Sequence, residues 1–238
     1  MANYQMLIDS EKCMNCKACV VACQQRNNVP YGLSRNWVLE TPEADAPAGF
    51  RFQPGACMHC EDAPCIPACP TGATWRSEAG VVEIDPERCV GCGACIDACP
   101  YGARFRHPVK KIADKCDYCA KFDYQPACVA VCPTRCRIFG DLDDASSPVV
   151  NALRTRKAVY VLPDDGSAKP HSAYLDATTP VVFQSRRQEP GPVAAIHPIS
   201  KGLAWISGII ITLISGVFVR QLLWPAHEHA SDDSGKES

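Results

Sequence analysis

The stretch CVGCGACIDACP, residues 89–100, places cysteines at positions 89, 92, 95 and 99 and a proline after the last of them. This C-x₂-C-x₂-C-x₃-C-P spacing is typical of thiols that hold iron–sulfur clusters. The first three thiols can bind one cube, and Gly91 and Gly93 allow the tight turns between them. Where such runs occur in pairs, the fourth thiol binds the cluster of the other run. The stretch therefore predicts a partner run in the same chain.

Three more runs of this kind occur along the chain. Of the 17 cysteines in 238 residues, sixteen form four quartets. The first quartet has the same spacing as the third, and residues 8–13 repeat the pattern of residues 84–89. The second and fourth quartets have a wider gap in the middle, and three of the four quartets end in Cys-Pro. The sequence therefore contains a repeated cluster-binding unit.

The order of the quartets predicts how they pair. The second and third quartets are joined by a short link with the strand-like residues 81–84, as two halves of one unit would be. We name these two quartets the inner pair, and the first and fourth quartets, which enclose them, the outer pair. If fourth thiols are exchanged within each pair, four [4Fe–4S] clusters are expected. Their ligands would be Cys13, Cys16, Cys19 and Cys132 (cluster 1); Cys23, Cys116, Cys119 and Cys128 (cluster 2); Cys57, Cys60, Cys65 and Cys99 (cluster 3); and Cys69, Cys89, Cys92 and Cys95 (cluster 4).

Zinc and disulfides are the competing uses of so many thiols. Zinc ribbons use two separated C-x₂-C knuckles, whereas every quartet here ends in C-x₃-C. Disulfides are typical of small secreted scaffolds with little core, which a chain of 238 residues does not resemble. The seventeenth cysteine, Cys136, is interpreted as a small buried residue, with a fifth ligand or a redox thiol as the alternative.

The sequence has no pattern for substrate chemistry. We find no phosphate loop, dinucleotide fingerprint or nucleophile motif, so the chain is not expected to be an enzyme on its own. His59 and His107 are interpreted as hydrogen-bond donors or surface residues, with cluster ligands as the alternative, and a net charge of −2 gives no basic footprint for nucleic acid. Some basic residues beside the quartets are expected either to favour reduced clusters or to be solvated surface charges: Lys12, Arg88, Lys115 and Arg135.

The remaining patterns predict an α+β fold: two nested bacterial-ferredoxin-like units with loop insertions, followed by a single C-terminal transmembrane helix. Ser147 before Pro148 predicts the start of a helix that continues to Arg154. Apolar runs predict extended segments at residues 4–9, 37–39, 50–52 and 158–162. The expected parts are a double ferredoxin-like domain over 1–160, a linker over 161–200, a transmembrane helix over 201–224 and a polar tail over 225–238.

The prediction of a transmembrane helix is based on residues 202–219, a stretch of eighteen residues without a charge. Extended to Trp224, a helix would measure roughly 33 Å at about 1.5 Å per residue, enough to cross a bilayer. Trp205 and Trp224 lie near its ends, as interfacial aromatic residues do. A buried helix of the soluble domain is the alternative. The first twenty residues show no secretory or twin-arginine pattern, so no export signal is expected in this chain.

The quartets resemble the four-cluster iron–sulfur subunits of membrane-bound molybdopterin oxidoreductases, such as dimethyl sulfoxide, polysulfide, thiosulfate and tetrathionate reductases and formate dehydrogenase-N. The resemblance covers about residues 4–160 and rests on the quartets together with CMHC at 57–60, CPTGA at 69–73 and CPYGA at 99–103. It implies a subunit that relays electrons between a molybdopterin-containing catalytic subunit and an integral membrane, quinone-reactive subunit. Because all sixteen positions are cysteine, it also implies four [4Fe–4S] clusters.

The apolar segment predicts a single-pass location at the cell membrane; many members of the resembling family lack a spanning helix, and this anchor is similar to the arrangement in formate dehydrogenase-N. Basic residues are nearly balanced across the apolar segment and lean slightly to a cytoplasmic cluster domain. The resembling family works mostly in the periplasm, exported with a signal-bearing partner, and we expect that side, with the cytoplasmic face as the alternative. The competing function is a membrane-tethered polyferredoxin that acts alone or with a hydrogenase.

Overall fold

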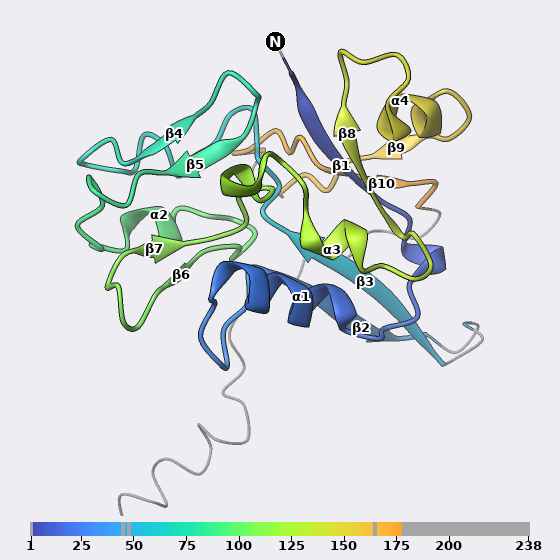
Figure 1. The fold of residues 1–238 in the computed structure, drawn as a ribbon, viewed down its shortest axis with the longest axis horizontal. Helices are drawn as coiled ribbons and strands as arrows, with labels where there is room; N and C mark the ends of the chain where they lie inside the picture. The colour runs from blue at the N-terminus through green and yellow to red at the C-terminus, as the bar shows by residue number, and fades with distance from the viewer. Residues whose placement is uncertain (1, 44–45, 47–48, 164–165, 178–238) are drawn as a thin grey trace, which may run out of the picture. The chain divides into compact units, whose positions relative to one another are not determined.

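The structure is a computed structural model that describes residues 2–43, 46, 49–163 and 166–177. All four quartets lie in one compact unit, Met1–Arg187. In this unit short strands and short helices are joined by long loops (Figure 1). The mixed helix and strand content agrees with the expected ferredoxin-like α+β class.

A four-stranded sheet joins the two ends of the described chain (Figure 1). Its strand order is β8-β1-β10-β9. β1 (Tyr4–Ile8) is antiparallel to β8 (Arg137–Asp141) and parallel to β10 (Ala173–Leu175), which pairs antiparallel with β9 (Ala158–Val159). β1 is apolar apart from Gln5, and residues 5–8 are buried on both faces because the strand lies inside the sheet. The expected strand at residues 4–9 is therefore confirmed.

Alternate residues of β1 contribute to two different cores. Leu7 packs with Val149 of α4 (Pro148–Leu153) in a small cluster on one face. Met6 and Ile8 belong to the larger core, which also contains buried cysteines of the quartets. α4 begins directly after Ser147, as predicted, although the Ser147 hydroxyl makes no cap hydrogen bond. The sheet thus separates a supporting helix from the cysteine-rich core.

The folded unit continues beyond the boundary expected at residue 160. β10 lies between β1 and β9, and its three residues are at most 2% exposed. The expectation of a linker over 161–200 is therefore wrong for residues 166–177, and the expected strand at 158–162 is shortened to β9. The missed strand is too short to show a pattern of its own. Its position depends on pairing with β1, in which Leu7 lies opposite Ala173.

Three antiparallel ribbons of two strands each extend from the core. Two of them follow the second and third quartets in sequence and lie beside the inner pair (Figure 1). The other contains the expected extended segments at 37–39 and 50–52. The ribbons are β2 (Asn36–Pro42) with β3 (Phe50–Ala56), β4 (Thr74–Arg76) with β5 (Val82–Ile84), and β6 (Phe105–Arg106) with β7 (Ala113–Asp114).

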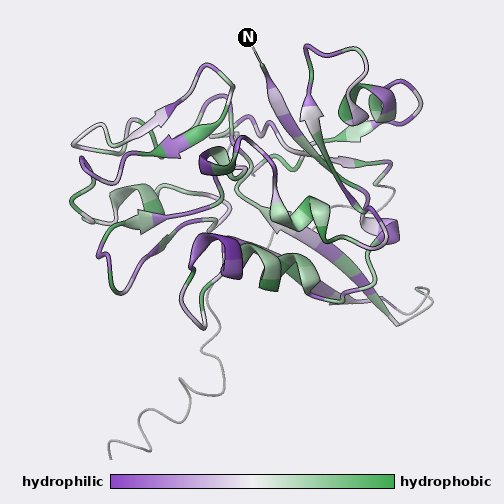
Figure 2. Ribbon diagram, viewed as in Figure 1, coloured by the Kyte–Doolittle hydropathy of each residue, from purple (hydrophilic) through white to green (hydrophobic). Residues whose placement is uncertain are grey.

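Three helices begin beside the third cysteine of a quartet and contain that cysteine: α1 (Ala18–Asn27), α2 (Ala94–Asp97) and α3 (Ala127–Ala130). α1 is hydrophobic in its first turns and hydrophilic in its last (Figure 2). α1 contacts α3, which brings the first and fourth quartets together. Two short 3₁₀ helices, η1 (Ser10–Lys12) and η2 (Ala120–Phe122), lie beside the first cysteine pairs of the outer quartets.

Within the described residues no helix is long and apolar enough to cross a membrane. The transmembrane helix expected over 201–224 and the tail over 225–238 lie outside the described residues.

Candidate metal centres

Each quartet opens with the same left-handed turn. The residue two positions after the first cysteine has a positive φ in all four quartets: Asn15 (55°), His59 (46°), Gly91 (66°) and Tyr118 (52°). At Gly91 an added Cβ atom would lie 1.8 Å from the carbonyl oxygen of Lys111, so this position requires glycine. The four C-x₂-C segments therefore share a left-handed residue at this position although their sequences differ.

One cavity brings thiols of the second and third quartets together. It is lined by Cys57, Cys60 and Cys65 of the second quartet and by Cys99, the fourth cysteine of the third. Burial raises the pKa of Cys60, and the neighbouring Cys57 and Cys99 thiols raise it further. Cys69, the fourth cysteine of the second quartet, does not line this cavity.

A second cavity joins the first and fourth quartets. Its lining includes Cys13, Cys16 and Cys19 of the first quartet and Cys132, the fourth cysteine of the fourth. Cys136 lines the same cavity, so five thiols face it. A hydrogen bond from Cys136 lowers the pKa of Cys13 to about 6 and outweighs the opposing effect of burial. The lowered pKa favours the thiolate, which is the form that binds metal.

The thiols expected for cluster 2 lie where the end of α1 meets the fourth quartet. Burial raises the pKa of Cys23 to about 12, and the nearby Cys128 and Cys119 thiols add to this rise. The pKa of Cys116 is also raised, by burial and then by Cys23 and Cys128. The Asn27 Nδ2 atom lies 3.6 Å from the Sγ atom of Cys23 and 3.9 Å from that of Cys119. One thiol of the first quartet thus lies among three of the fourth.

The thiols expected for cluster 4 are connected through their neighbours. Arg88, the residue before Cys89, donates from Nη2 to the carbonyl oxygen of Thr71 at 2.9 Å. Thr71 lies two residues after Cys69, so the chain around the fourth cysteine of the second quartet adjoins the start of the third. Burial opposes ionisation of Cys69, but hydrogen bonds from Thr71 and from backbone N–H groups lower its pKa to about 7. Cys92 is exposed.

The cysteines fit iron–sulfur clusters in their chemistry. All seventeen are free thiols, so the structure supports no disulfide framework. Burial raises the pKa of Cys99 to about 11, and a buried thiolate there needs positive charge close by. Iron ions supply that charge, and metal binding is coupled to loss of the thiol protons. Among the described residues, no three Cys, His, Asp or Glu side chains are placed to hold a single metal ion.

Two buried arginines lie against these thiols. Arg104 is 4% exposed and donates from Nη2 to the Sγ atom of Cys65 at 2.9 Å. Arg137 is 2% exposed; burial opposes its charge, but the nearby Cys128 and Cys19 thiols raise its pKa. The Nε atoms of both side chains are buried without a hydrogen-bond partner in the described part of the chain. These N–H groups are available to the sulfur atoms of a cluster.

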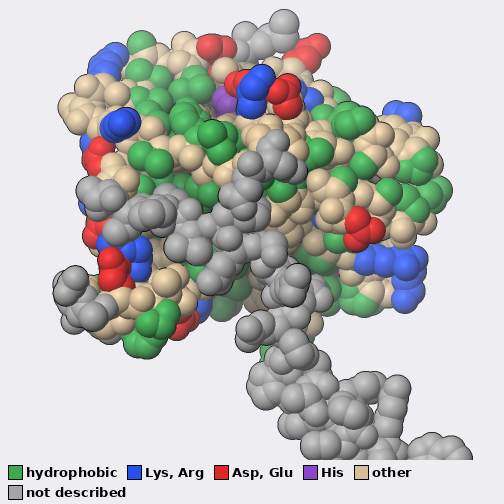
Figure 3. Space-filling view, turned by 180° about the vertical axis from the view of Figure 1, so that it is seen from behind, with side chains coloured by type: hydrophobic (Ala, Val, Ile, Leu, Met, Phe, Trp, Pro, Cys, Tyr) green, Lys and Arg blue, Asp and Glu red, His purple; other side chains and the backbone are tan. Residues whose placement is uncertain are grey.

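The sequence analysis did not single out Arg104 or Arg137. Of the four basic residues that it named, only Lys115 is buried, and its Nζ donates to the carbonyl oxygens of Val82 and Cys116. The other three are exposed: Lys12, Arg88 and Arg135. On the face drawn in Figure 3, basic and acidic side chains lie in small groups among hydrophobic ones.

His59 and His107 are both buried, so the surface interpretation is wrong for them. The Nδ1 atom of His59 accepts the backbone N–H of Val82 at 3.1 Å, and that of His107 accepts the backbone N–H of Val109 at 3.3 Å. Burial lowers the pKa of His59 well below its usual value, which keeps the ring neutral. Each side chain therefore accepts a hydrogen bond beside a quartet, whereas the sequence predicted a donor.

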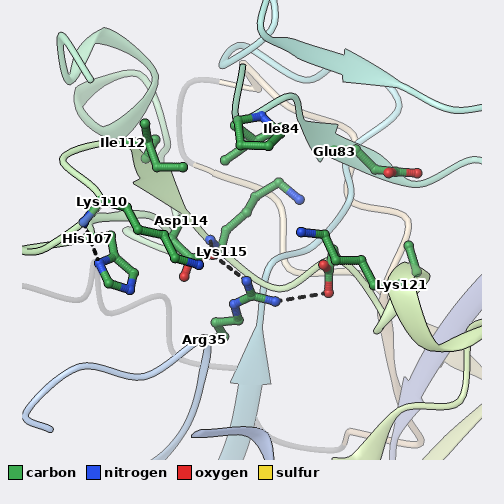
Figure 4. A pocket seen from close by; sticks show the side chains of 13 residues that line it. Arg35, Glu83, Ile84, His107, Lys110, Ile112, Asp114, Lys115 and Lys121 are labelled. Atoms are coloured by element: carbon green, nitrogen blue, oxygen red, sulfur yellow. Dashed lines mark hydrogen bonds and ion pairs between the residues drawn. The ribbon is translucent and has the colours of Figure 1, made fainter. Parts of the chain in front are cut away.

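Arg35 holds the outer pair together at a pocket of about 300 Å³ (Figure 4). Its Nη2 atom pairs with Asp114 at 2.7 Å and its Nη1 atom with Asp117 at 3.1 Å. Nη1 also donates to the Oδ1 atom of Asn27, the last residue of α1, at 2.9 Å. Because the two aspartates flank Cys116 in sequence, Arg35 connects the first quartet to the fourth. The positive charge of Arg35 is therefore balanced by two carboxylates that it holds in the fold.

Comparison with protein families gives two matches, both to 4Fe-4S dicluster domains. One covers residues 48–142, which include the inner pair, and the other covers residues 12–73. Together they span all four quartets.

Several characterised and uncharacterised proteins are similar to the chain. Protein NrfC of Escherichia coli is 46% identical over 160 residues, which cover 64% of this chain and 72% of NrfC. The thiosulfate reductase electron transfer subunit PhsB of Salmonella typhi is 46% identical over 149 residues, covering 60% of this chain and 78% of PhsB. A putative iron-sulfur subunit of a dimethyl sulfoxide reductase from Halobacterium salinarum is 37% identical over 210 residues, covering 74% of this chain and 80% of that protein.

These similarities agree with the repeated quartets, the shared turns and the thiol-lined cavities. The chain belongs to the family of ferredoxin-like [4Fe–4S] electron-transfer subunits of oxidoreductase complexes.

Proposed function

We propose that the chain relays electrons through four [4Fe–4S] clusters whose ligands are exchanged within the inner and outer pairs, as set out for clusters 1 to 4. The observation that carries this proposal is the cavity in which Cys99 joins Cys57, Cys60 and Cys65. The cavity in which Cys132 joins the first quartet supports the same arrangement. In both, the fourth thiol comes from the partner quartet, as the exchange requires.

The relay would begin and end at clusters 1 and 4. Cys16 and Cys92, expected ligands of these clusters, are the exposed cysteines of the chain. An apolar side chain beside each is also exposed: Met14 at 60% and Val90 at 67%. Exposed apolar residues next to a terminal cluster suit contact with a partner subunit. Clusters 2 and 3 would then carry electrons between the two ends.

In the proposed complex this subunit is not catalytic. A molybdopterin-containing subunit would perform the substrate reaction, and an integral membrane subunit would exchange electrons with quinone. The apolar residues 202–219 would anchor the chain as a single membrane-spanning helix, with the cluster domain in the periplasm. Similarity to a thiosulfate reductase electron transfer subunit and to a dimethyl sulfoxide reductase iron-sulfur subunit supports this class of complex.

Anaerobic purification of the full chain from its native membrane tests both parts of the proposal. Iron and acid-labile sulfide should match four cubes, and a large molybdenum-containing protein should copurify. Zinc in place of iron, or metal sufficient for two clusters only, would contradict the cluster assignment. Four clusters with a hydrogenase, or with no partner, would instead support the membrane-tethered polyferredoxin. Protease treatment of intact spheroplasts should digest the cluster domain if it is periplasmic, and a resistant domain would place it in the cytoplasm.

A further inference from the structure

Arg104 and Arg137 occupy the same position in two different quartets. Each is the fifth residue after the fourth cysteine, Cys99 in one case and Cys132 in the other. A proline follows each of these cysteines, and each arginine lies at or directly before a strand, β6 or β8. One arginine therefore belongs to the inner pair and the other to the outer pair, at repeat-related sites.

Arg104 lies between the expected ligands of clusters 3 and 4. It lines the cavity that contains Cys65 and Cys99, and its Nη2 atom donates to the Sγ atom of Cys65 at 2.9 Å. Cys95, an expected ligand of cluster 4, is also close enough to interact with its charge. Nη1 donates to the Thr74 hydroxyl at 3.2 Å. Thr74 is itself the fifth residue after a fourth cysteine, so the two related halves of the inner pair meet at this hydrogen bond.

Arg137 has the corresponding place in the outer pair. Its charge interacts with Cys19, an expected ligand of cluster 1, and with Cys128, an expected ligand of cluster 2. Nη2 donates to the backbone carbonyl oxygens of Trp37 at 3.3 Å and Gly55 at 3.2 Å, which fixes the side chain on the β2–β3 ribbon. Nε and Nη1 are buried and have no hydrogen-bond partner among the described residues.

No carboxylate is within ion-pair distance of either arginine in the described part of the chain. An unpaired guanidinium is costly to bury, because arginine stays charged and loses its hydration. The groups beside these two side chains that can balance the charge are the thiolates and the clusters that they would hold. The arrangement is thus favourable only when negative charge is present on both sides of each arginine.

We propose that Arg104 and Arg137 are bridging cations, each buried between the two clusters of one pair, where each raises the reduction potentials of both clusters. This inference rests on the proposed ligand sets. A fixed positive charge stabilises the reduced cluster, which carries one more negative charge, more than the oxidised one. N–H donors directed at cluster sulfur act in the same direction. One side chain therefore sets the potentials of a pair together.

The test is a redox titration of the purified, cluster-loaded protein, followed by electron paramagnetic resonance. Arg104→Gln should lower the midpoint potentials of two clusters by about 59 mV or more. For a one-electron couple this equals a tenfold fall in the equilibrium constant for reduction. Arg137→Gln should lower those of the other two, and the double variant should lower all four. Arg135→Gln is the matched control, because this arginine lies near Cys132 but is exposed. Solvent screening should keep its effect on the reduction equilibria below about threefold.

Iron and sulfide content, measured first, separates the two levels of the proposal. Wild-type protein without four clusters would contradict the proposed function. Fully loaded Arg104→Gln or Arg137→Gln protein with unchanged potentials, or with shifts no larger than that of the exposed control, would overturn only the bridging role. If a glutamine variant loses iron, Arg104→Lys and Arg137→Lys decide, because they keep the charge and change the shape. In the lysine variants, the equilibrium constants for cluster reduction should lie within about threefold of the wild-type values. A tenfold or larger fall in these constants would overturn the inference.

Discussion

The outer and inner pairs of quartets use the same left-handed turns but are held by different kinds of contact. In the inner pair, the β4–β5 and β6–β7 ribbons lie close in sequence to the cysteines that they support. In the outer pair, the link is long-range: β1 pairs with β8 so that Ile8 lies opposite Arg137, and Arg35 connects Asn27 to Asp117. Turn geometry is therefore local in both pairs, whereas the assembly of the outer clusters depends on the sheet.

Exchange of the fourth thiols predicts the largest effects in either pair. Cys99→Ser should perturb or remove the cluster held by Cys57, although Cys99 belongs to the quartet of Cys89. Cys132→Ser should in the same way perturb the cluster held by Cys13. Each substitution removes one of four expected ligands from a cluster of the partner quartet. Iron analysis and electron paramagnetic resonance of the single variants measure which cluster signal changes.

Cys69→Ser is the matched control for the inner pair, since it should affect the cluster held by Cys89 and spare the one held by Cys57. If Cys69→Ser and Cys57→Ser alter the same signal, the quartets bind their clusters independently and the exchange is wrong.

The Ile-Asp dipeptide at residues 8–9 is repeated at residues 84–85, and substitutions of its aspartates should give the next largest difference between the pairs. Asp9 is 1% exposed and forms ion pairs with Arg156 and, at 3.1 Å, with Lys12. The equivalent Asp85 is half-buried and accepts the backbone N–H of Glu87 at 2.9 Å. Asp9→Asn should lower the free energy of unfolding by about 2 kcal/mol, because Arg156 loses a buried charged partner. Asp85→Asn should cost below about 1 kcal/mol, since asparagine can accept the same N–H bond. Urea unfolding of the loaded protein compares them, and equal losses would contradict the asymmetry.

The pH dependence of that difference follows from the lowered pKa of Asp9. Burial opposes the carboxylate, but hydrogen bonds from Arg156 and Lys12 lower its pKa below the usual 3.8. A lowered pKa in the folded state contributes stability above the unfolded pKa, and this contribution is lost only as the pH falls through the folded value. The gap between wild type and Asp9→Asn should therefore stay constant from about pH 8 to about pH 5. A gap that closes within this range would show that Asp9 titrates near neutrality.

The features that the sequence predicted are those encoded by local spacing. The quartets, the turn at Gly91, β1 and the start of α4 each depend on residues that are near one another in the chain. β10 could not be found in this way, because HSAYL is buried only through pairing with β1. The place of Cys136 also depends on long-range register. The backbone N–H of Asp9 donates to the Cys136 carbonyl oxygen at 2.7 Å, and this brings Cys136 to the cavity of Cys13.

Arg104 and Arg137 illustrate a signal that was present but not used. Their common offset from Cys99 and Cys132 is visible in the sequence, whereas their burial is not. Closeness to a cysteine in the sequence instead pointed to Arg88 and Arg135 as residues that favour reduced clusters, but both are exposed.

Cys136 provides the smallest and most specific test of the comparison. It is the fourth residue after Cys132, and the corresponding position after Cys99 is Ala103, which is fully buried. Cys136→Ala would make the outer pair like the inner pair at this position. Since alanine already fills the related site and a thiol adds little volume, the free energy of unfolding should fall by about 1 kcal/mol or less.

The iron content of Cys136→Ala should be unchanged, because Cys13, Cys16, Cys19 and Cys132 supply the expected ligands of cluster 1. Loss of the Cys136 hydrogen bond to Cys13 should lower the potential of cluster 1 alone, since fewer donors to a ligand sulfur favour the oxidised state. Loss of one cluster's iron in Cys136→Ala, with Cys132→Ser remaining fully loaded, would instead identify Cys136 as the fourth ligand.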